Sequence, residues 1–298
     1  RLWISSLEDS AILDGMQHLR SAEEYRHLAE AAVCRSQADW LVGMNATRAY
    51  TTKYFKKLTV GRVQTPTLAM LVERAGQISN FQKEKYFNVE LDCDGIPAVK
   101  PKIFDPDEAE QLRSRCHGNE AIVTSVKETE KKVKAPKLYD LTTLQREANR
   151  IYGMTAKQTL DTAQSLYEKK LITYPRTDSQ YLTEDMEQTA RNVVRQIYEK
   201  YQLTGPFDQP EQPDVKKVMN NSKVTDHHAI IPTMELASSH LDELKSWEEK
   251  ILFLIAVHTV MAMSKDHIYQ ETEIEVECQG EIFKAKRKDC SAGWMETL

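Results

Sequence analysis

Tyr174 and Arg176 carry the side chains in this sequence best suited to covalent chemistry on a phosphate. They stand two residues apart in the segment ITYPRTDS, residues 172–179. Because Tyr174 precedes a proline, an extended conformation is favoured, in which both side chains project to the same side. A phenol has an ordinary pKa of about 10, and a guanidinium beside it favours the phenolate and can hold a phosphate. The pair can therefore form and stabilise a phosphotyrosine bond.

A second candidate pair, His227 and His228, lies in DHHAIIPT, residues 226–233. Adjacent residues in extended backbone face opposite ways, so the two imidazoles make a poor bidentate metal site. The apolar residues 229–231 that follow indicate a buried segment. We expect one histidine to be packed and the other to be presented.

A third pattern suits nucleic acid. From Trp40 to Val72 there is no acidic residue, and basic residues are interleaved with aromatic ones: Arg48, Lys53, Lys56, Lys57 and Arg62 with Tyr50, Tyr54 and Phe55. Basic side chains neutralise phosphates and aromatic rings stack on bases, as binding of a single strand requires. The alternative is a solvated basic helix face.

The elements that must position these residues begin with a long helix. The capping box Ser21-Ala22-Glu23-Glu24 predicts its start, and the helical pattern runs toward Lys57. Arg35 and Asp39 are four residues apart, so they share a helical face and can pair or jointly hold a ligand.

A turn and a second helix follow. Thr65-Pro66 predicts an N-cap and a proline at the first helical position, with the helix ending near Gly76. The turn at residues 59–64 then points toward a helix amino terminus. We expect backbone amides there to receive a phosphate, supported by Arg62 and Gln64.

The next region has the two-residue period of half-buried strands. Residues 86–92 and 121–126 alternate in this way, and residues 273–278 repeat the pattern near the carboxyl end. This predicts one β-rich domain made of two separated segments. Between the first two runs, Asp105-Pro106 and the acidic residues after it predict a helix start rather than a metal site.

Two capped helices precede Tyr174. The first helix is expected to begin at Thr142 and end at Gly153, and residues 155–158 form a capping box at the start of the second helix. Such a pair joined by a short glycine-containing turn is a helix-turn-helix-like unit.

Several of these motifs occur in the order and spacing of one family. They are residues 144–148 (LQREA), 167–168 (YE), 172–179 and 226–233, preceded by R-x-x-x-DWLVG at 35–43 and GRVQT at 61–65. Together they resemble the active-site region of type IA DNA topoisomerases, closest to the topoisomerase III branch. The resemblance touches most of the chain.

The resemblance implies an α+β multidomain fold, in which helical, helix-turn-helix-like (CAP-like) active-site and gate domains are joined by a β-rich arch. We expect residues 1–80 to be the first part of the gate domain. Residues 81–136 with 246–298 would form the arch, and residues 137–245 the inserted active-site domain.

The implied activity is ATP-independent strand passage through a 5′-phosphotyrosine link to single-stranded DNA, which relaxes negative supercoils or decatenates. Tyr174 would be the nucleophile, with Arg176 and His227 stabilising charge on the phosphoryl oxygens. The expected DNA-binding residues are Arg35, Asp39, Thr59, Val60, Gly61, Arg62, Val63, Gln64, Thr177 and Ser179.

Enzymes of this family begin with a Toprim domain that supplies an acid–base glutamate, a lysine and an acidic magnesium cluster. This sequence starts within the region that normally follows, so the resemblance implies a fragment lacking that domain. We expect Mg²⁺ only in the full-length enzyme, bound by the Toprim domain, and no metal site in this chain. By itself the chain should bind single-stranded DNA but neither cleave efficiently nor relax supercoils.

Composition fits this interpretation. The 298 residues carry a net charge of −5, which argues against a protein that coats DNA through overall positive charge. No apolar run approaches the ~18 residues of a membrane span, and the five cysteines are far apart without a C-x-x-C pair. We expect a cytoplasmic, nucleoid-associated monomer that has a helicase partner.

Two other classes compete with this interpretation. One is a helix-turn-helix DNA-binding protein without chemistry, for which Tyr174→Phe would be silent. The other is a tyrosine recombinase or relaxase, but the spaced Arg/His pattern of the first and the His-hydrophobic-His pattern of the second are missing.

Overall fold

The computed structural model describes residues 4–203 and 213–290. The predicted domain ranges 1–80, 137–245 and 246–298 therefore each include some residues outside the described part of the chain. The chain divides into two compact units, which we describe separately. The first unit comprises residues 19–88 and 102–110, and the second comprises residues 2–18, 89–101 and 111–298.

The first unit is dominated by two helices, α2 (Arg26–Tyr54) and α3 (Gln64–Ser79), with a short 3-10 helix, η1 (Glu23–Tyr25), before α2. The long helix is confirmed, but its capping box is not. Ser21 Oγ donates to the Glu24 carboxylate at 3.3 Å, and the α-helix begins only after η1.

The start of α3 also differs from the prediction. The helix begins at Gln64, and Thr65 Oγ1 accepts a hydrogen bond from the Gly61 amide at 3.0 Å. It runs past Gly76 to Ser79, and its last turn is closed by the Asn80 amide bonding to the Gly76 carbonyl at 3.0 Å. A glycine inside a helix costs only about 1 kcal/mol, so it need not end one.

Within the described residues, neither α2 nor α3 buries a side chain. Large apolar groups on and beside them are exposed, including Trp40 at 65% and Phe55 at 94%. Most of an ordinary helix's stability comes from burying one face. These two helices therefore lack that contribution in this structure.

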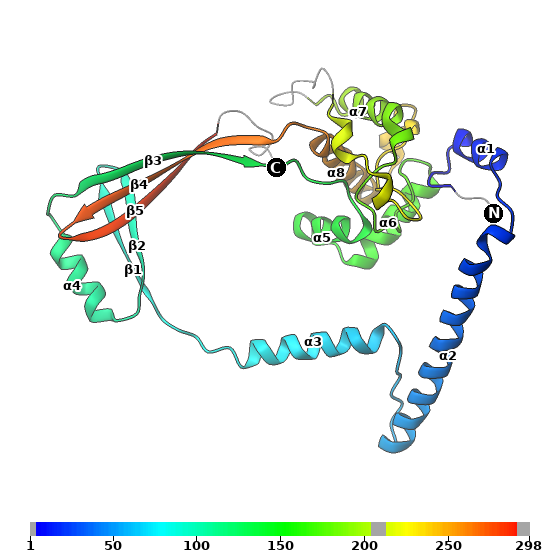
Figure 1. Cartoon of the computed structure of the whole chain (residues 1–298), viewed down its shortest axis with the longest axis horizontal. Helices are drawn as coiled ribbons and strands as arrows, with labels where there is room; N and C mark the ends of the chain where they lie inside the picture. The colour runs from blue at the N-terminus through cyan, green and yellow to red at the C-terminus, as the bar shows by residue number, and fades with distance from the viewer. Residues whose placement is uncertain (1–3, 204–212, 291–298) are drawn as a thin grey trace. The chain divides into compact units, whose positions relative to one another are not determined.

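Among the described residues, the second unit contains most of a five-stranded sheet with the order β1-β2-β5-β4-β3. The strands are β1 (Phe87–Cys93), β2 (Ile96–Ile103), β3 (Ile122–Val133), β4 (His267–Cys278) and β5 (Glu281–Cys290). Figure 1 shows β3, β4 and β5 side by side. β3 and β4 pair antiparallel from Ile122 opposite Glu277 to Val133 opposite His267, with a bulge after Val123. One sheet from two distant segments is thus confirmed.

The helix after β2, α4 (Pro106–Cys116), starts as the sequence predicts. The Asp105 carboxylate accepts a hydrogen bond from the Asp107 amide at 2.9 Å, with Pro106 at the first helical position. Asp105 therefore acts as an N-cap.

The helical part of the second unit consists of α1 (Asp9–Gln17), α5 (Leu141–Tyr152), α6 (Ala156–Glu168), α7 (Glu187–Tyr201) and α8 (Ser246–Ala262). In the described part of this region, short 3-10 helices join them: η2 (Glu184–Met186), η3 (Val215–Val218), η4 (Asn221–Lys223), η5 (Met234–Leu236) and η6 (Leu241–Glu243). None of the helices in the described residues is long and apolar enough to span a membrane.

The caps of α5 and α6 explain how they start and stop. Asp140 caps α5 by accepting from the Thr143 amide at 2.6 Å, and Gly153 closes the helix at φ 68°. Thr155 and Gln158 form the predicted capping box of α6. The two-helix unit before Tyr174 is confirmed, with the N-cap two residues before the predicted Thr142.

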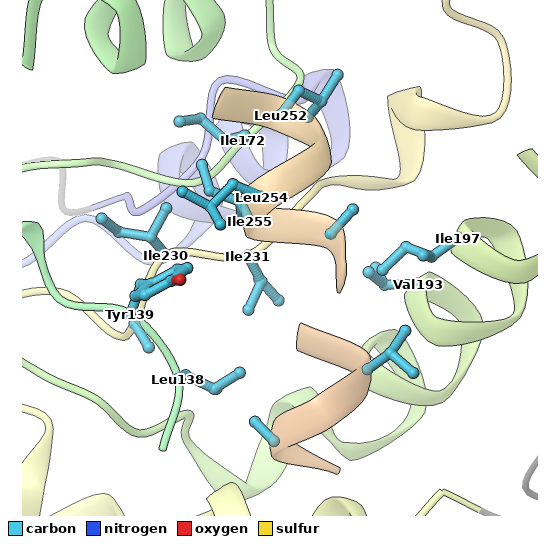
Figure 2. Packing of buried hydrophobic residues seen from close by; sticks show 14 of the residues in the cluster. Leu138, Tyr139, Ile172, Val193, Ile197, Ile230, Ile231, Leu252, Leu254 and Ile255 are labelled. Atoms are coloured by element: carbon cyan, nitrogen blue, oxygen red, sulfur yellow. The ribbon is translucent and has the colours of Figure 1, made fainter. Parts of the chain in front are cut away.

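One hydrophobic core holds this part together. Figure 2 shows side chains from several segments meeting in it, among them Leu138, Tyr139, Ile172, Val193, Ile197, Ile230, Ile231, Leu252, Leu254 and Ile255. Helix α8 buries residues around most of its circumference, as expected of a central helix.

The placement of α8 corrects one predicted boundary. Residues 246–262 were assigned to the arch with the carboxyl-terminal strands, yet α8 packs with α5, α6 and α7 in the helical core. A helix that is apolar on nearly all sides needs neighbours all round, which one face of a sheet does not supply. The second segment of the sheet therefore begins at His267.

Candidate active site

Two sequence-distant segments lie against each other at the site. Ile172 forms an isolated bridge with Pro232, and the Thr173 amide donates to the Ile231 carbonyl at 3.0 Å. The Thr173 hydroxyl is buried, donating to the Ala229 carbonyl and accepting from the Ile231 amide, both at 3.0 Å. The ITYPRTDS and DHHAIIPT motifs thus form one structural unit.

Tyr174 is half-buried at the edge of the hydrophobic core. Its ring lies 4.4 Å from the His227 ring, tilted by 45°, and 5.3 Å from the Tyr167 ring in an edge-on arrangement. Its amide donates to the Ser5 carbonyl at 2.8 Å. Two rings therefore contact the Tyr174 ring and one hydrogen bond fixes its backbone, from residues that precede and follow it in the sequence.

The two histidines differ as the sequence predicts. His228 is 9% exposed, and its Nδ1 lies 2.9 Å from the Ala229 carbonyl oxygen. His227 is half-buried, and its Nδ1 lies 3.3 Å from the Ser5 hydroxyl. His228 is the packed residue, and His227 is the one presented beside Tyr174.

Burial lowers the pKa of His227 below its ordinary value of 6.5, and the nearby Asp226 carboxylate opposes this only in part. The imidazole is therefore mostly neutral at neutral pH in the free protein. The expected imidazolium would form only when a bound anion offsets the desolvation.

A cavity of about 420 Å³ opens beside these residues. It is lined by Asp140, Leu141, Thr142, Arg176, Thr177, Asp178, Thr225, Asp226 and His227. Arg176, which is exposed, and His227 share its wall, so the structure brings these two predicted residues together. Three carboxylates also line it, which restricts a phosphate to the side of the guanidinium and the imidazole.

Thr177 and Ser179 are both buried. The Thr177 hydroxyl donates to the His227 carbonyl at 2.9 Å and so ties the two motifs together. The Ser179 hydroxyl donates to the Lys223 carbonyl at 2.9 Å and is 4% exposed, and its contact with DNA stays a prediction.

The remaining predicted residues lie in the first unit. Arg62 Nε lies 2.6 Å from Asp39 Oδ1, so Asp39 pairs with a residue of the following turn and not with Arg35. Both side chains are about half exposed. The DNA-binding residues predicted in this unit are Arg35, Asp39, Thr59, Val60, Gly61, Arg62, Val63 and Gln64.

The backbone of this turn is partly occupied. The Val60 amide donates to the Thr47 hydroxyl at 2.9 Å, and the Gly61 amide to the Thr65 hydroxyl at 3.0 Å. A Cβ at Gly61 would lie 2.9 Å from Gln64 Cγ, so a larger residue there would require the Gln64 side chain to move. These two amides are therefore already hydrogen-bonded within the protein, and binding of a phosphate by the turn stays a prediction.

Sequence reasoning missed Ser5 entirely. It touches both Tyr174 and His227 from the opposite end of the chain, and no local spacing signals such a contact. Tyr167 belonged to a recognised motif, but its edge-on contact with the Tyr174 ring was not expected.

The sequence model of a family described as DNA topoisomerase matches residues 23–298. The chain belongs to this family. One curated relative is DNA topoisomerase 3 of Bacillus subtilis, which is 42% identical over an alignment that covers 99% of this chain and 42% of the relative. Another is DNA topoisomerase 3 of Staphylococcus epidermidis, which is 40% identical over 96% of this chain and 41% of the relative. The chain thus spans about two fifths of the length of the curated relatives it matches.

The fold is also that of a topoisomerase. The structure of full-length topoisomerase I from Thermotoga maritima superposes on this chain with a TM-score of 0.78 and 25% sequence identity. The match covers 98% of this chain and 48% of the Thermotoga chain. The resemblance to type IA enzymes, on the topoisomerase III branch, is confirmed together with the predicted fold class.

Proposed function

We propose that this chain carries the nucleophile of a type IA DNA topoisomerase that cuts and rejoins single-stranded DNA. The observation that carries the proposal is the grouping of Tyr174, His227 and Arg176, the last two on one cavity wall. The relatives named DNA topoisomerase 3 support the same activity.

In the proposed reaction, the Tyr174 hydroxyl oxygen attacks a backbone phosphorus. The new oxygen–phosphorus bond joins the protein to the 5′ phosphate, while the bond from phosphorus to the 3′ oxygen breaks and that oxygen leaves as a hydroxyl. The 3′ hydroxyl reverses the step after another strand has passed. One phosphodiester replaces another, so no nucleotide hydrolysis is needed.

Arg176 and His227 have distinct roles in this proposal. The exposed guanidinium of Arg176 binds nonbridging phosphoryl oxygens and offsets their growing charge. His227 donates a hydrogen bond to the same phosphoryl group, with Ser5 beside its Nδ1. Tyr167 and Ser5 fix the ring and the backbone of Tyr174, so the nucleophile is oriented before the DNA arrives.

Magnesium enters only as an expectation for the longer enzyme. Among the described residues, no three His, Cys, Asp or Glu side chains converge to hold a metal ion. No step on this chain is therefore assigned to a metal, and the Toprim domain stays the expected place of Mg²⁺.

A chimeric enzyme tests the proposal. Residues 1–298 replace the matching segment of Bacillus subtilis DNA topoisomerase 3, and the product is incubated with a single-stranded oligonucleotide labelled at its 3′ end. We expect the label to migrate with the denatured protein, and Tyr174→Phe to abolish this transfer. Tyr152→Phe, on α5, is the matched control. Transfer that persists in Tyr174→Phe would refute the assignment.

The runner-up, a helix-turn-helix protein without chemistry, is not favoured by the relatives. In the same assay it would give no covalent label with the unaltered chimera. We also propose the bacterial cytoplasm, at the nucleoid, as the site of action. The helicase partner and the monomeric state stay predictions.

A further inference from the structure

Two lysines converge on one tyrosine outside the group just described. Lys137 Nζ lies 5.6 Å and Lys223 Nζ 5.0 Å from the centre of the Tyr181 ring. Both lysines are exposed and Tyr181 is half-buried. The three residues come from three separate segments, so the fold itself brings the two positive charges together.

Neither charge is balanced by a carboxylate. Within the described residues, neither Lys137 nor Lys223 forms an ion pair. Other lysines do: Lys132 and Lys217, for example, both pair with Asp266. Two ammonium groups near one ring repel each other, and an anion between them would relieve this repulsion.

The phenol supports the same interpretation. Burial alone raises the pKa of Tyr181, yet the ammonium groups of Lys137 and Lys223 beside its hydroxyl lower the pKa overall. The local potential is thus positive enough to favour a negatively charged oxygen at this position.

This cluster adjoins the cavity of Arg176 and His227. The Lys223 carbonyl accepts from the Ser179 hydroxyl at 2.9 Å, and the Tyr181 carbonyl accepts from the Ala229 amide at 2.9 Å. Thr225, two residues after Lys223, and Asp140, three residues after Lys137, line that cavity. The lysines therefore stand on the segments that form its rim.

We propose that Lys137, Tyr181 and Lys223 form a second phosphate site, which binds a backbone phosphodiester of the strand that Tyr174 attacks, next to the scissile one. The inference rests on the proposed function for the identity of the strand. The ammonium groups donate to the nonbridging oxygens. A strand held at two phosphates has a fixed register, which places one phosphorus in front of the Tyr174 hydroxyl.

Salt dependence of binding by the whole chain tests this site. A fluorescent thymidine oligonucleotide is titrated with the unaltered protein and with Lys137→Gln/Lys223→Gln between 50 mM and 200 mM salt. Each phosphate contact on a single strand contributes about 0.7 to the slope of log K against log salt. Because the two lysines hold one phosphate, the double variant should lose about 0.7 from that slope, so the factor by which it binds more weakly than the unaltered protein shrinks about 2.6-fold over this range.

Lys250→Gln is the matched control, because Lys250 also lies over aromatic rings, 4.7 Å from that of Trp247 and 5.7 Å from that of Tyr152, on α8. Its slope should equal that of the unaltered protein. An unchanged slope in the double variant would overturn the second phosphate site, as would an equal loss in Lys250→Gln. Circular dichroism confirms that all variants fold.

The two proposals fail separately. If the chimera forms the Tyr174-dependent covalent link while the double variant keeps its slope, the phosphate site is wrong and the proposed function stands. If the slope falls by about 0.7 but no covalent link ever forms, the site binds a nucleic-acid phosphate and the enzymatic proposal is wrong.

Discussion

Replacement of Glu248 should reveal how α6 is fixed in front of the nucleophile. This carboxylate, at the start of α8, is only 3% exposed. It accepts from Ser165 Oγ and Lys169 Nζ, both at 2.6 Å, and from the Lys245 amide at 2.9 Å. Ser165 is on α6 and Lys169 is its C-cap, five residues before Tyr174. The interaction therefore anchors the end of the helix that leads into the active segment.

The magnitude follows from the titration of Glu248. Burial raises the pKa, but the hydrogen bonds from Lys169 and Ser165 outweigh it, and the pKa falls from 4.5 to about 2. A shift of this size corresponds to about 3 kcal/mol. Because the folded-state pKa is depressed, this stability is present above pH 4.5 and is lost as the pH falls toward 2.

Urea unfolding of the unaltered chain and of Glu248→Gln, followed by tryptophan fluorescence, measures this contribution. We expect a difference in unfolding free energy of about 2–3 kcal/mol at pH 7, which narrows to less than half as the pH falls to about 3. Glu249→Gln, the exposed neighbour, should change stability little. A Glu248→Gln difference that is below about 0.5 kcal/mol, or independent of pH, would refute the reasoning.

Three other predictions follow from side chains described above. Because a bound phosphate should raise the lowered pKa of His227, affinity for a thymidine oligonucleotide should increase as the pH falls from 8 to about 5; a pH profile unaffected by His227→Gln would contradict this. Among the cysteines whose side chains are described, the exposed Cys34 thiol should react with a disulfide reagent at pH 7 before Cys116, which is buried and has a pKa raised to about 11. Loss of the rapid phase in Cys34→Ser checks the order. Asp39→Asn should leave the melting temperature unchanged, because its pair with Arg62 is about half exposed; a clear drop in a thermal melt would show otherwise.

Local signals in the sequence located several helix ends correctly, although the capping box predicted at Ser21 and the N-cap predicted at Thr65 were wrong. The capping box at Thr155, the left-handed Gly153 and the N-cap at Asp105 all depend on neighbours within four residues. Alternating strands also appeared where expected, because their period of two is read directly from the sequence.

Contacts between distant residues were not readable in this way. Asp39 has Arg35 one helical turn away, yet it pairs with Arg62 because the turn after α2 folds back onto that helix. Ser5 reaches His227 across 222 positions, and only the folded chain brings them together. Periodicity identifies a helix such as α8 but does not say which domain surrounds it.

The bare surfaces of α2 and α3 have a thermodynamic consequence. With no side chain buried in the described residues, the two helices are held mainly by their own backbone hydrogen bonds and intrinsic propensity. On heating the isolated chain, these helices should fray gradually from their ends over a broad temperature range. The core around α8 should instead unfold in a single sharp transition, so a calorimetric trace would contain one narrow peak on a sloping background.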